Sequence, residues 1–468
     1  MMMQEKYFID YDKISKTFAF KDPQANENTL NHRANKEMRI LPYQANKSKI
    51  VIDLKGVVGA LIRSISGKTL KEFNKDDFIK AVVDCVAEFE DEALEAGFIN
   101  IIKTTFINDE GNLVNFDIST MQYINSTSED ETYAEFLSDV LFDDELKNRM
   151  KDYFTPHSNN AMTSLVLKAL ANLESDESRK TKNTYHSLLP FVREQFKNDI
   201  VFLMSNPDMF CSCFERVLEF YNVFYVSQLA MKLTELEKAD YSQPTPIYYC
   251  MSWEKLSKNR RAYKYGYEKL KKSVDSLYSY SILLEMINNS KLNEKIGFNE
   301  LYNIMAEDDD VEKQFEKLID EYKSRIVDTN WEDFKFERKE LDVEGYNRIY
   351  ELVECIEYQF VNKNSSRRGA YDAYAKRCKS FIENNFGKRR GILGYTLALN
   401  EDDVVLLTKL IINNNEKIKL SRVFEEFQNR GIFLDKDSKT KVIQLYEKLN
   451  LLEKKSDSGD AQYVKSSL

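Results

Sequence analysis

The chain has 468 residues, and its 43% hydrophobic and 12% aromatic content is enough for two or three packed domains, which excludes a disordered chain. Glycine (14) and proline (7) are scarce, a composition that favours long helices with short connections. The formal net charge of −10 repels a nucleic-acid backbone, so any contact with DNA must come from local basic surface. We therefore expect a mainly α fold.

Membrane and secretory features are missing from the sequence pattern. The apolar runs fall far short of the roughly 20 residues that a membrane-spanning helix needs, and the first residues lack the pattern of a secretory signal. The cysteines form no closely spaced disulfide framework, so we expect reduced thiols; they are Cys85, Cys211, Cys213, Cys250, Cys355 and Cys378. These features predict a cytoplasmic protein that does not contact a membrane.

The first 130 residues are predicted to form a small mixed α/β part. Ile50 to Leu54 reads as a short strand, and Asn100 to Ile107 and Leu113 to Ile118 read as a hairpin around a turn that contains Gly111. Residues 131–362 have apolar side chains every three or four positions, as a core-facing helix requires. We expect these residues to form a helical body.

A first basic segment runs from Lys255 to Lys272. It holds eight Lys or Arg residues against Glu268 alone, with Tyr263, Tyr265 and Tyr267 interleaved. Basic groups beside exposed rings suit phosphate contact with base or sugar stacking. The alternative is a helix whose tyrosines pack inward beneath a solvated lysine face. The candidate contact residues of this secondary patch are Lys258, Arg260, Arg261 and Lys264.

A second basic segment runs from Lys363 to Arg390, within a predicted linker region of residues 363–399. Nine basic residues there face two acidic ones, and its pieces Asn364 to Gly369 and Gly387 to Gly391 read as loops. Arginine side chains on loops can fork onto phosphates. The alternative is a linker that docks on an acidic partner. The candidate DNA-binding residues are Arg367, Arg368, Lys376, Arg377, Lys388, Arg389 and Arg390.

Residues 400–468 are predicted to form a winged-helix-type domain. Apolar residues from Val404 to Ile411 indicate a helix, a second helix runs from Leu420 to about Arg430, and Gly431 ends it. A third helix begins near Asp435 to Ser438, and two strand-like pieces joined by a tight turn follow Leu451. Three helices followed by a β-hairpin is the winged-helix pattern.

In DNA-binding winged helices the third helix enters the major groove and the wing touches the backbone. The candidates on that helix are Lys436, Ser438, Lys439, Lys441 and Gln444, and those on the wing are Lys454 and Lys455. Because the same fold often binds proteins, DNA contact and protein contact both stay open for this domain.

No catalytic constellation is recognisable. The segment Ser66 to Thr69 lacks the glycine that a phosphate-binding loop needs five residues earlier, where Ile62 stands. The three histidines are widely separated, which gives a zinc site little support. Asp333 with Glu337 and Lys339 is the only string loosely suited to a metal-dependent nuclease. We expect an accessory protein rather than an enzyme, with no cofactor, no metal and no small-molecule substrate.

The C-terminal residues resemble one known family. Gly391 to Leu397, Leu420 to Phe427, Arg430 to Phe433 and Lys455 to Val464 are similar to the DptG family, the G components of DNA phosphorothioation-dependent restriction systems. The resemblance is specific over about the last 80 residues; upstream it rests on length, helical character and Tyr43 to Lys47. It implies a role in bacterial defence against phage, in a complex with DptF- and DptH-type subunits that process unmarked DNA.

The leading hypothesis is a non-catalytic subunit that holds duplex DNA and assembles a restriction complex. The alternative is a scaffold subunit that docks partner proteins and never contacts DNA. A third hypothesis, a cryptic nuclease, would depend on Glu337 and Lys339.

Overall fold

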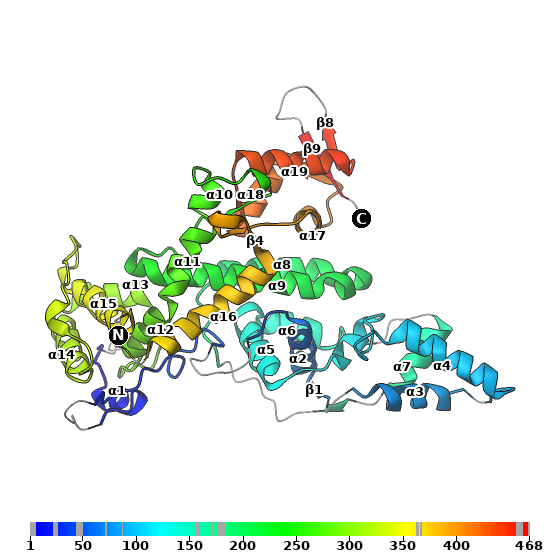
Figure 1. Cartoon of the computed structure of the whole chain (residues 1–468), viewed down its shortest axis with the longest axis horizontal. Coiled ribbons are helices and arrows are strands. Elements are labelled where there is room, and N and C mark those ends of the chain that lie inside the picture. The colour runs from blue at the N-terminus through cyan, green and yellow to red at the C-terminus, as the bar shows by residue number, and fades with distance from the viewer. Residues whose placement is uncertain are drawn as a thin grey trace, which may run out of the picture. The chain divides into compact units, whose positions relative to one another are not determined.

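The fold is seen in a computed structural model that describes residues 6–21, 27–43, 50–70, 73–86, 88–155, 160–170, 173–175, 184–251, 253–361, 365, 367–454 and 462–466. In this part of the chain nineteen α-helices are joined by short connections, and nine strands of two to four residues account for the β structure (Figure 1). The prediction of a mainly helical protein is confirmed. No described helix is both long enough and apolar enough to span a membrane.

The chain divides into two compact units, each built from segments that are distant in sequence. Unit 1 contains residues 1–50, 226–248 and 253–397. Unit 2 contains residues 51–225, 249–252 and 398–468. Helix α9 (Pro207–Glu235) begins in unit 2, and its residues from Val226 onward belong to unit 1.

Unit 1 is a helical assembly with one small hairpin. Its helices are α1 (Tyr11–Thr17), α10 (Arg261–Lys264), α11 (Tyr267–Asp275), α12 (Leu277–Asn288), α13 (Phe298–Glu307), α14 (Asp310–Ser324), α15 (Asn347–Val361) and α16 (Arg368–Phe386), and its hairpin strands are β4 (Gly387–Arg389) and β5 (Tyr395–Leu397). Strand β3 (Tyr248–Tyr249) lies at the unit boundary. Helices α14 and α15 pack side by side, as Figure 1 shows.

The core of unit 1 is rich in tyrosine. The Tyr278 ring of α12 lies 4.7 Å from that of Tyr374 on α16 and 5.3 Å from that of Phe360 on α15, measured between ring centroids. The carboxylate of Glu285 is fully buried. It accepts hydrogen bonds from the backbone N–H groups of residues 36–38 at 2.7 to 3.3 Å. These hydrogen bonds stabilise the negative charge of the carboxylate. This contact attaches the N-terminal segment to α12.

Unit 2 begins with helices and two very short strands. These elements are α2 (Lys55–Ser66), β1 (Lys68–Thr69), α3 (Lys75–Asp84), α4 (Glu92–Phe106), α5 (Ser128–Leu141), α6 (Asp144–Lys151), α7 (Ala161–Ala169), β2 (Glu174–Ser175) and α8 (Pro190–Met204). Helix α5 starts where its capping box dictates: the Thr127 side chain accepts from the Asp130 N–H, and Asp130 accepts in return from Thr127. Its buried face packs on α2 and α8.

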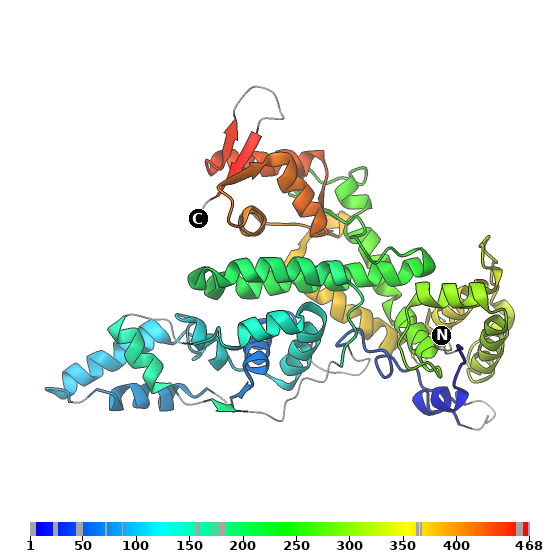
Figure 2. The same cartoon turned by 180° about the vertical axis from the view of Figure 1, so that it is seen from behind.

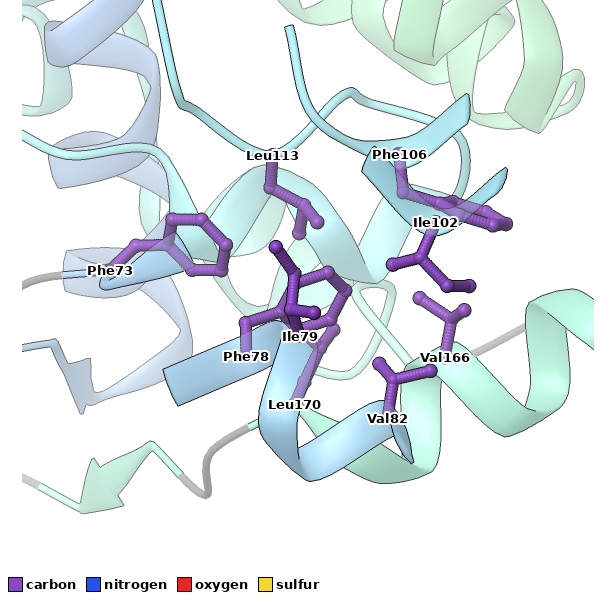
Figure 3. Close-up of a cluster of buried hydrophobic side chains, with 9 residues drawn as sticks. All are labelled: Phe73, Phe78, Ile79, Val82, Ile102, Phe106, Leu113, Val166 and Leu170. Carbon is purple, nitrogen blue, oxygen red and sulfur yellow. The ribbon is translucent and has the colours of Figure 1, made fainter. Parts of the chain in front are cut away.

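A separate apolar cluster holds α3, α4 and α7 of unit 2 together. Figure 3 shows its buried side chains gathered from the three helices, from Phe73 just before α3, from Leu113 and from Leu170 just after α7. Ile102 of α4 and Val166 of α7 have no exposed surface. Since apolar burial is the main stabilising term in such a cluster, this three-helix packing depends on a small set of side chains.

Three of the expected strands, at residues 50–54, 100–107 and 113–118, are wrong. Residues 50–54 form no strand, and α4 continues to Phe106, where the first strand of the predicted hairpin was placed. Only the single bridge between Ile107 and Leu113 remains of that hairpin. Phe98, Ile102 and Phe106 are spaced four residues apart, so a helix turns them all toward α3 and α7, and this packing outweighs the local strand preference.

The last part of unit 2 contains the elements that the sequence predicts for residues 400–468. They are α17 (Glu401–Ile412), β6 (Lys417–Lys419), α18 (Leu420–Asn429), β7 (Phe433–Leu434), α19 (Lys436–Lys448), β8 (Leu452–Lys454) and β9 (Gln462–Lys465). Gly431 ends α18 in the left-handed conformation, with φ of 74°. The sequence does not predict strands β6 and β7. Strand β6 pairs with β9, which also pairs with β8, in an antiparallel sheet of order β6-β9-β8. Strand β8 lies against α19 and strand β9 against α18; both strands are red in Figure 2. The predicted turn between them lies outside the described residues.

Candidate nucleic-acid interface

The two basic segments, distant from one another in sequence, meet in unit 1. Strand β5 contacts both α10 and α11, and β4 contacts α16 (Figure 1). The guanidinium Nη1 of Arg390 donates to the backbone oxygen of Leu256 at 2.9 Å, which links the hairpin directly to the first segment. Residues 255–267 and 384–400 contain no Asp or Glu, and Glu254, Glu268 and Glu383 lie directly beyond these ranges.

The β4–β5 hairpin is anchored at its base. Lys388 pairs with Thr396 and Arg389 with Tyr395. The Tyr395 ring lies 5.8 Å from the ring of Tyr267 on α11, and the Tyr267 hydroxyl donates to Glu383 on α16. These contacts hold the short strands against two helices, so the basic side chains of β4 have a fixed base.

Five exposed basic side chains come from these neighbouring elements. They define the basic hairpin surface: Lys258, Arg261, Lys264, Lys388 and Arg389. Tyr265 is 50% exposed beside them. Its ring lies 6.2 Å from that of Tyr248, whose hydroxyl accepts from Arg261 at 3.3 Å. Exposed cations next to an open aromatic face can bind phosphate and stack on a sugar or base.

The sequence leaves two alternatives for the tyrosines of the first basic segment, exposed rings that stack on a ligand or rings that pack inward. The structure shows both. Tyr267 is buried, as the inward-packing alternative requires, whereas Tyr265 is half exposed. Tyr263 is partly buried. Arg260, the remaining candidate of this patch, is partly buried as well. The segment therefore packs one face and offers another to solvent.

Arg367 is engaged in a structural ion pair instead of projecting from a loop. Its Nη1 and Nη2 atoms lie 3.0 and 2.7 Å from the two carboxylate oxygens of Asp328, and its Nε donates to Gln359 at 2.7 Å. Burial disfavours the charged form of Asp328, but the hydrogen bonds from Arg367 and Asn28 hold its pKa below the ordinary value. A guanidinium held in this way has few donors left for phosphate.

The predicted loops of the second basic segment are mostly regular structure. Arg368 is the first residue of α16, and Gly387 to Arg389 form β4. The reason is the apolar face of α16, with Tyr371, Tyr374 and Phe381 buried, which continues the helix through a stretch of mixed charge. Lys363 lies outside the described residues.

The remaining candidates on α16 differ in accessibility. Arg368 and Lys376 are exposed, and Arg368 lies 3.6 Å from the carboxylate of Asp372. Arg377 is buried, 8% exposed, and donates to the backbone oxygen of Ala373. A buried arginine cannot reach a phosphate, so Arg368 and Lys376 are the accessible cations of this helix.

The candidates on α19 also fall into two groups. Lys436, Lys441 and Gln444 are exposed. Ser438 has no exposed surface, and its hydroxyl oxygen accepts the backbone N–H of Met251 at 3.2 Å, within unit 2. The start of α19 is therefore covered at Ser438, and this side chain cannot approach a base edge.

Three further C-terminal candidates lie near other side chains or outside the structure. The ammonium of Lys439 lies 5.2 Å from the ring centroid of Phe424. Lys454 pairs with Glu447 at 2.7 Å and is about half exposed. Lys455 lies outside the described residues. The C-terminal elements thus present fewer accessible cations than the sequence suggests.

The string proposed for a nuclease does not form a carboxylate and lysine cluster. The Lys339 ammonium lies 3.4 Å from the ring centroid of Tyr350, and burial lowers the pKa of this lysine. Asp333 accepts from the side chain of Asn330 at 2.7 Å. In the described ranges no three His, Cys, Asp or Glu side chains lie close enough together to hold a metal ion. That the protein is not an enzyme stays a prediction.

The sequence does not predict the accessibility of two residues, Ile392 and Arg430. Ile392, at the tip of the β4–β5 hairpin, is 99% exposed, and its position between Gly391 and Gly394 in a basic stretch was the available signal. Arg430 is almost fully buried in an ion pair with Asp199; nothing in the local sequence indicates this distant partner.

Comparison with protein-family models found no match, and comparison with curated proteins found no match either.

Proposed function

We propose that this protein is a non-catalytic subunit that holds duplex DNA and assembles a restriction complex, as the resemblance to the DptG family suggests. In this proposal it works in the cytoplasm with DptF- and DptH-type subunits against DNA that lacks phosphorothioate marks. The observation that carries the proposal is the basic hairpin surface, where two basic segments of an acidic chain lie together around the exposed ring of Tyr265.

Local charge, more than net charge, governs contact between a protein and DNA. A protein with a net charge of −10 is repelled by DNA at long range, yet within a Debye length of about 8 Å only nearby groups matter. Lys388 and Arg389 on β4, with Arg261 and Lys264 on α10, form a positive region without an acidic residue in either stretch. Phosphate contact through such groups is independent of sequence and sensitive to salt.

The C-terminal elements support a winged-helix module in a secondary role. The order α17, β6, α18, β7, α19 and then β8 and β9, with the sheet order β6-β9-β8, supports this proposal. Met251 covers the start of α19 at Ser438, while Lys441 and Gln444 further along are exposed. We infer that α19 makes backbone contacts rather than reading bases, and that affinity comes mainly from the basic hairpin surface.

The alternative is a scaffold subunit whose basic surface docks an acidic partner protein. The buried pair of Arg430 and Asp199 favours it for one part of the chain, because it ties the end of α18 to α8 within unit 2. A module that is fixed in this way can have a structural role as well as a role in binding DNA. The two functions differ in whether isolated protein binds DNA.

The test is binding to a fluorescently labelled duplex, followed by anisotropy at several salt concentrations. One variant replaces Arg261, Lys264, Lys388 and Arg389 by Ala. Its matched control replaces four exposed lysines of α3, α4 and α7 by Ala: Lys75, Lys80, Lys103 and Lys168. Both variants lose four positive charges, so only the position of the charge differs.

We expect the hairpin variant to lose at least about tenfold in affinity and the control to bind as wild type does. The slope of log affinity against log salt should fall by roughly 0.9 for each phosphate contact removed. Equal losses in both variants would show a non-specific charge effect. Failure of the wild type to bind at any salt, together with binding to the partner subunits, would establish the scaffold alternative.

A further inference from the structure

The tip of the β4–β5 hairpin presents an isoleucine to solvent. Ile392 is 99% exposed, the highest value among the large hydrophobic residues that are exposed in the described part of the chain. An exposed aliphatic side chain on a helix usually shares its surface with neighbours, whereas this one stands at the end of a two-stranded projection. A single exposed hydrophobic residue needs no explanation; the significance of Ile392 lies in the backbone that holds it and in the charges around it.

The turn that carries Ile392 is held by three backbone hydrogen bonds. The Arg390 N–H donates to the Gly394 oxygen at 2.8 Å, the Leu393 N–H to the Arg390 oxygen at 2.9 Å, and the Gly394 N–H to the Gly391 oxygen at 3.2 Å. Gly391 and Gly394 have φ of 45° and 71°, values that favour glycine. The turn is thus internally bonded, and its two glycines permit the backbone path that projects Ile392.

The base of the projection is positively charged and fixed. Arg389 precedes Ile392 by three residues, and Lys388 by four. The paired strand that holds Lys388 and Arg389 leads directly into the closed turn of Ile392. When the tip faces a groove of the duplex, these cations are near the phosphates that border it.

We propose that the β4–β5 hairpin inserts Ile392 as a wedge into the minor groove of duplex DNA, where it partly unstacks one base step and bends the duplex. The proposal rests on the proposed DNA-holding function. Proteins that bend DNA through the minor groove combine the same two features. An aliphatic side chain separates two bases, while neighbouring cations bind the backbone on either side. Charge complementarity between the acid-free hairpin and phosphate identifies DNA as the occupant.

The experiment compares affinity with bending in the full-length protein. Duplexes of about 30 base pairs carry a donor and an acceptor dye at their ends to report bending, and a second set carries 2-aminopurine to report unstacking. The variants are Ile392→Ser, the conservative Ile392→Leu, and Ile101→Ser as a control at a half-exposed isoleucine of α4. Since Ile392 has almost no packing contacts to lose, its variants should fold.

We expect wild type, Ile392→Leu and Ile101→Ser to raise the energy transfer and the 2-aminopurine signal on binding. Ile392→Ser should bind with less than about tenfold loss of affinity and with neither signal. Lys388→Ala with Arg389→Ala should weaken binding instead.

Four results would overturn the wedge. If Ile392→Ser bends and unstacks DNA as wild type does, or if the wild-type complex is unbent, the wedge is wrong while the DNA-holding function stands. If the wild type binds no DNA, the holding function and the wedge are both wrong. If Ile392→Ser abolishes binding to a partner subunit and leaves DNA bending unchanged, the tip fits a pocket on a protein.

Discussion

The guanidinium of Arg430 and the carboxylate of Asp199 form a two-point ion pair with almost no contact with solvent. Arg430 Nη2 lies 2.6 Å from one oxygen and Nε 3.0 Å from the other, and the side chains are 3% and 1% exposed. The Tyr221 hydroxyl donates to the same carboxylate at 2.5 Å. Burial alone would lower the pKa of Arg430, but Asp199 keeps it above the ordinary value. The pair therefore joins the end of α18 to α8 and α9 in the interior of unit 2.

Arg430→Ala should destabilise unit 2 by about 3–5 kcal/mol, because it leaves the Asp199 carboxylate buried without its charge partner. The exposed pair of Lys448 and Glu401, with side chains 70% and 55% exposed, provides the control, and Lys448→Ala should cost under about 1 kcal/mol. Both tryptophans, Trp253 and Trp331, belong to unit 1. Urea unfolding should therefore be followed by circular dichroism and by hydrogen exchange of α18 amides. Equal effects of the two variants would contradict the buried pair.

Two adjacent isoleucines of α4 should respond very differently to the same change. Ile102 is fully buried in the cluster of Figure 3, whereas Ile101 is 50% exposed. Ile102→Ala should cost about 2–5 kcal/mol by cavity formation, and Ile101→Ala should stay within about 0.5 kcal/mol of wild type. Thermal unfolding and proteolysis of α4 measure the difference. Similar losses at both positions would mean that α4 packs through a different face.

Glu215 on α9 should make the stability of unit 2 depend on pH. Burial first, and then the charges of Glu219 and Asp53, raise the pKa of this carboxyl from 4.5 to about 7. Between these values the folded protein binds more protons than the unfolded chain, so stability falls as the pH rises through that window and is level above it. A group whose folded pKa is raised above its unfolded value therefore favours the fold only when protonated.

Glu215→Gln should consequently match wild type near pH 4.5 and be more stable at about pH 8, by on the order of 1 kcal/mol after allowance for solvent screening. Glu194→Gln, at an exposed carboxylate of α8, is the control and should show no such trend. Melting temperatures at a series of pH values measure both. A constant difference between Glu215→Gln and wild type across the series would rule out the titration.

The sequence predicts elements well where periodicity and a stop signal agree. The three C-terminal helices follow from apolar spacing, and Gly431 marks the end of α18. At α4 the β-branched and aromatic residues favour a strand. The segment is nevertheless helical because Ile102 and Phe106 pack on helices that are distant in sequence. Local sequence does not reveal a contact with α7, which lies about sixty residues further along the chain.

The sequence predicts which segments of the candidate site are basic, but it does not predict which of their side chains are accessible to solvent. Arg367 and Arg389 look alike in sequence, but Asp328, 39 residues away, neutralises the first while the second is exposed. Ser438 looked free at the start of α19, and its partner Met251 is 187 residues distant. Counting charges along the chain identifies basic segments. Which of their side chains are occupied depends on long-range partners that only the fold provides.

The interleaving of the two units has a consequence for how the chain is made. Unit 1 needs both its first 50 residues and the segment that ends at Leu397. At a synthesis rate of about 5–20 residues per second, the ribosome spends on the order of tens of seconds between those two points. During that time Ile14 and Phe18, which are fully buried in the finished protein, have no completed interior to enter. Yield in the cell should therefore depend on the translation rate and on chaperones that shield early apolar segments.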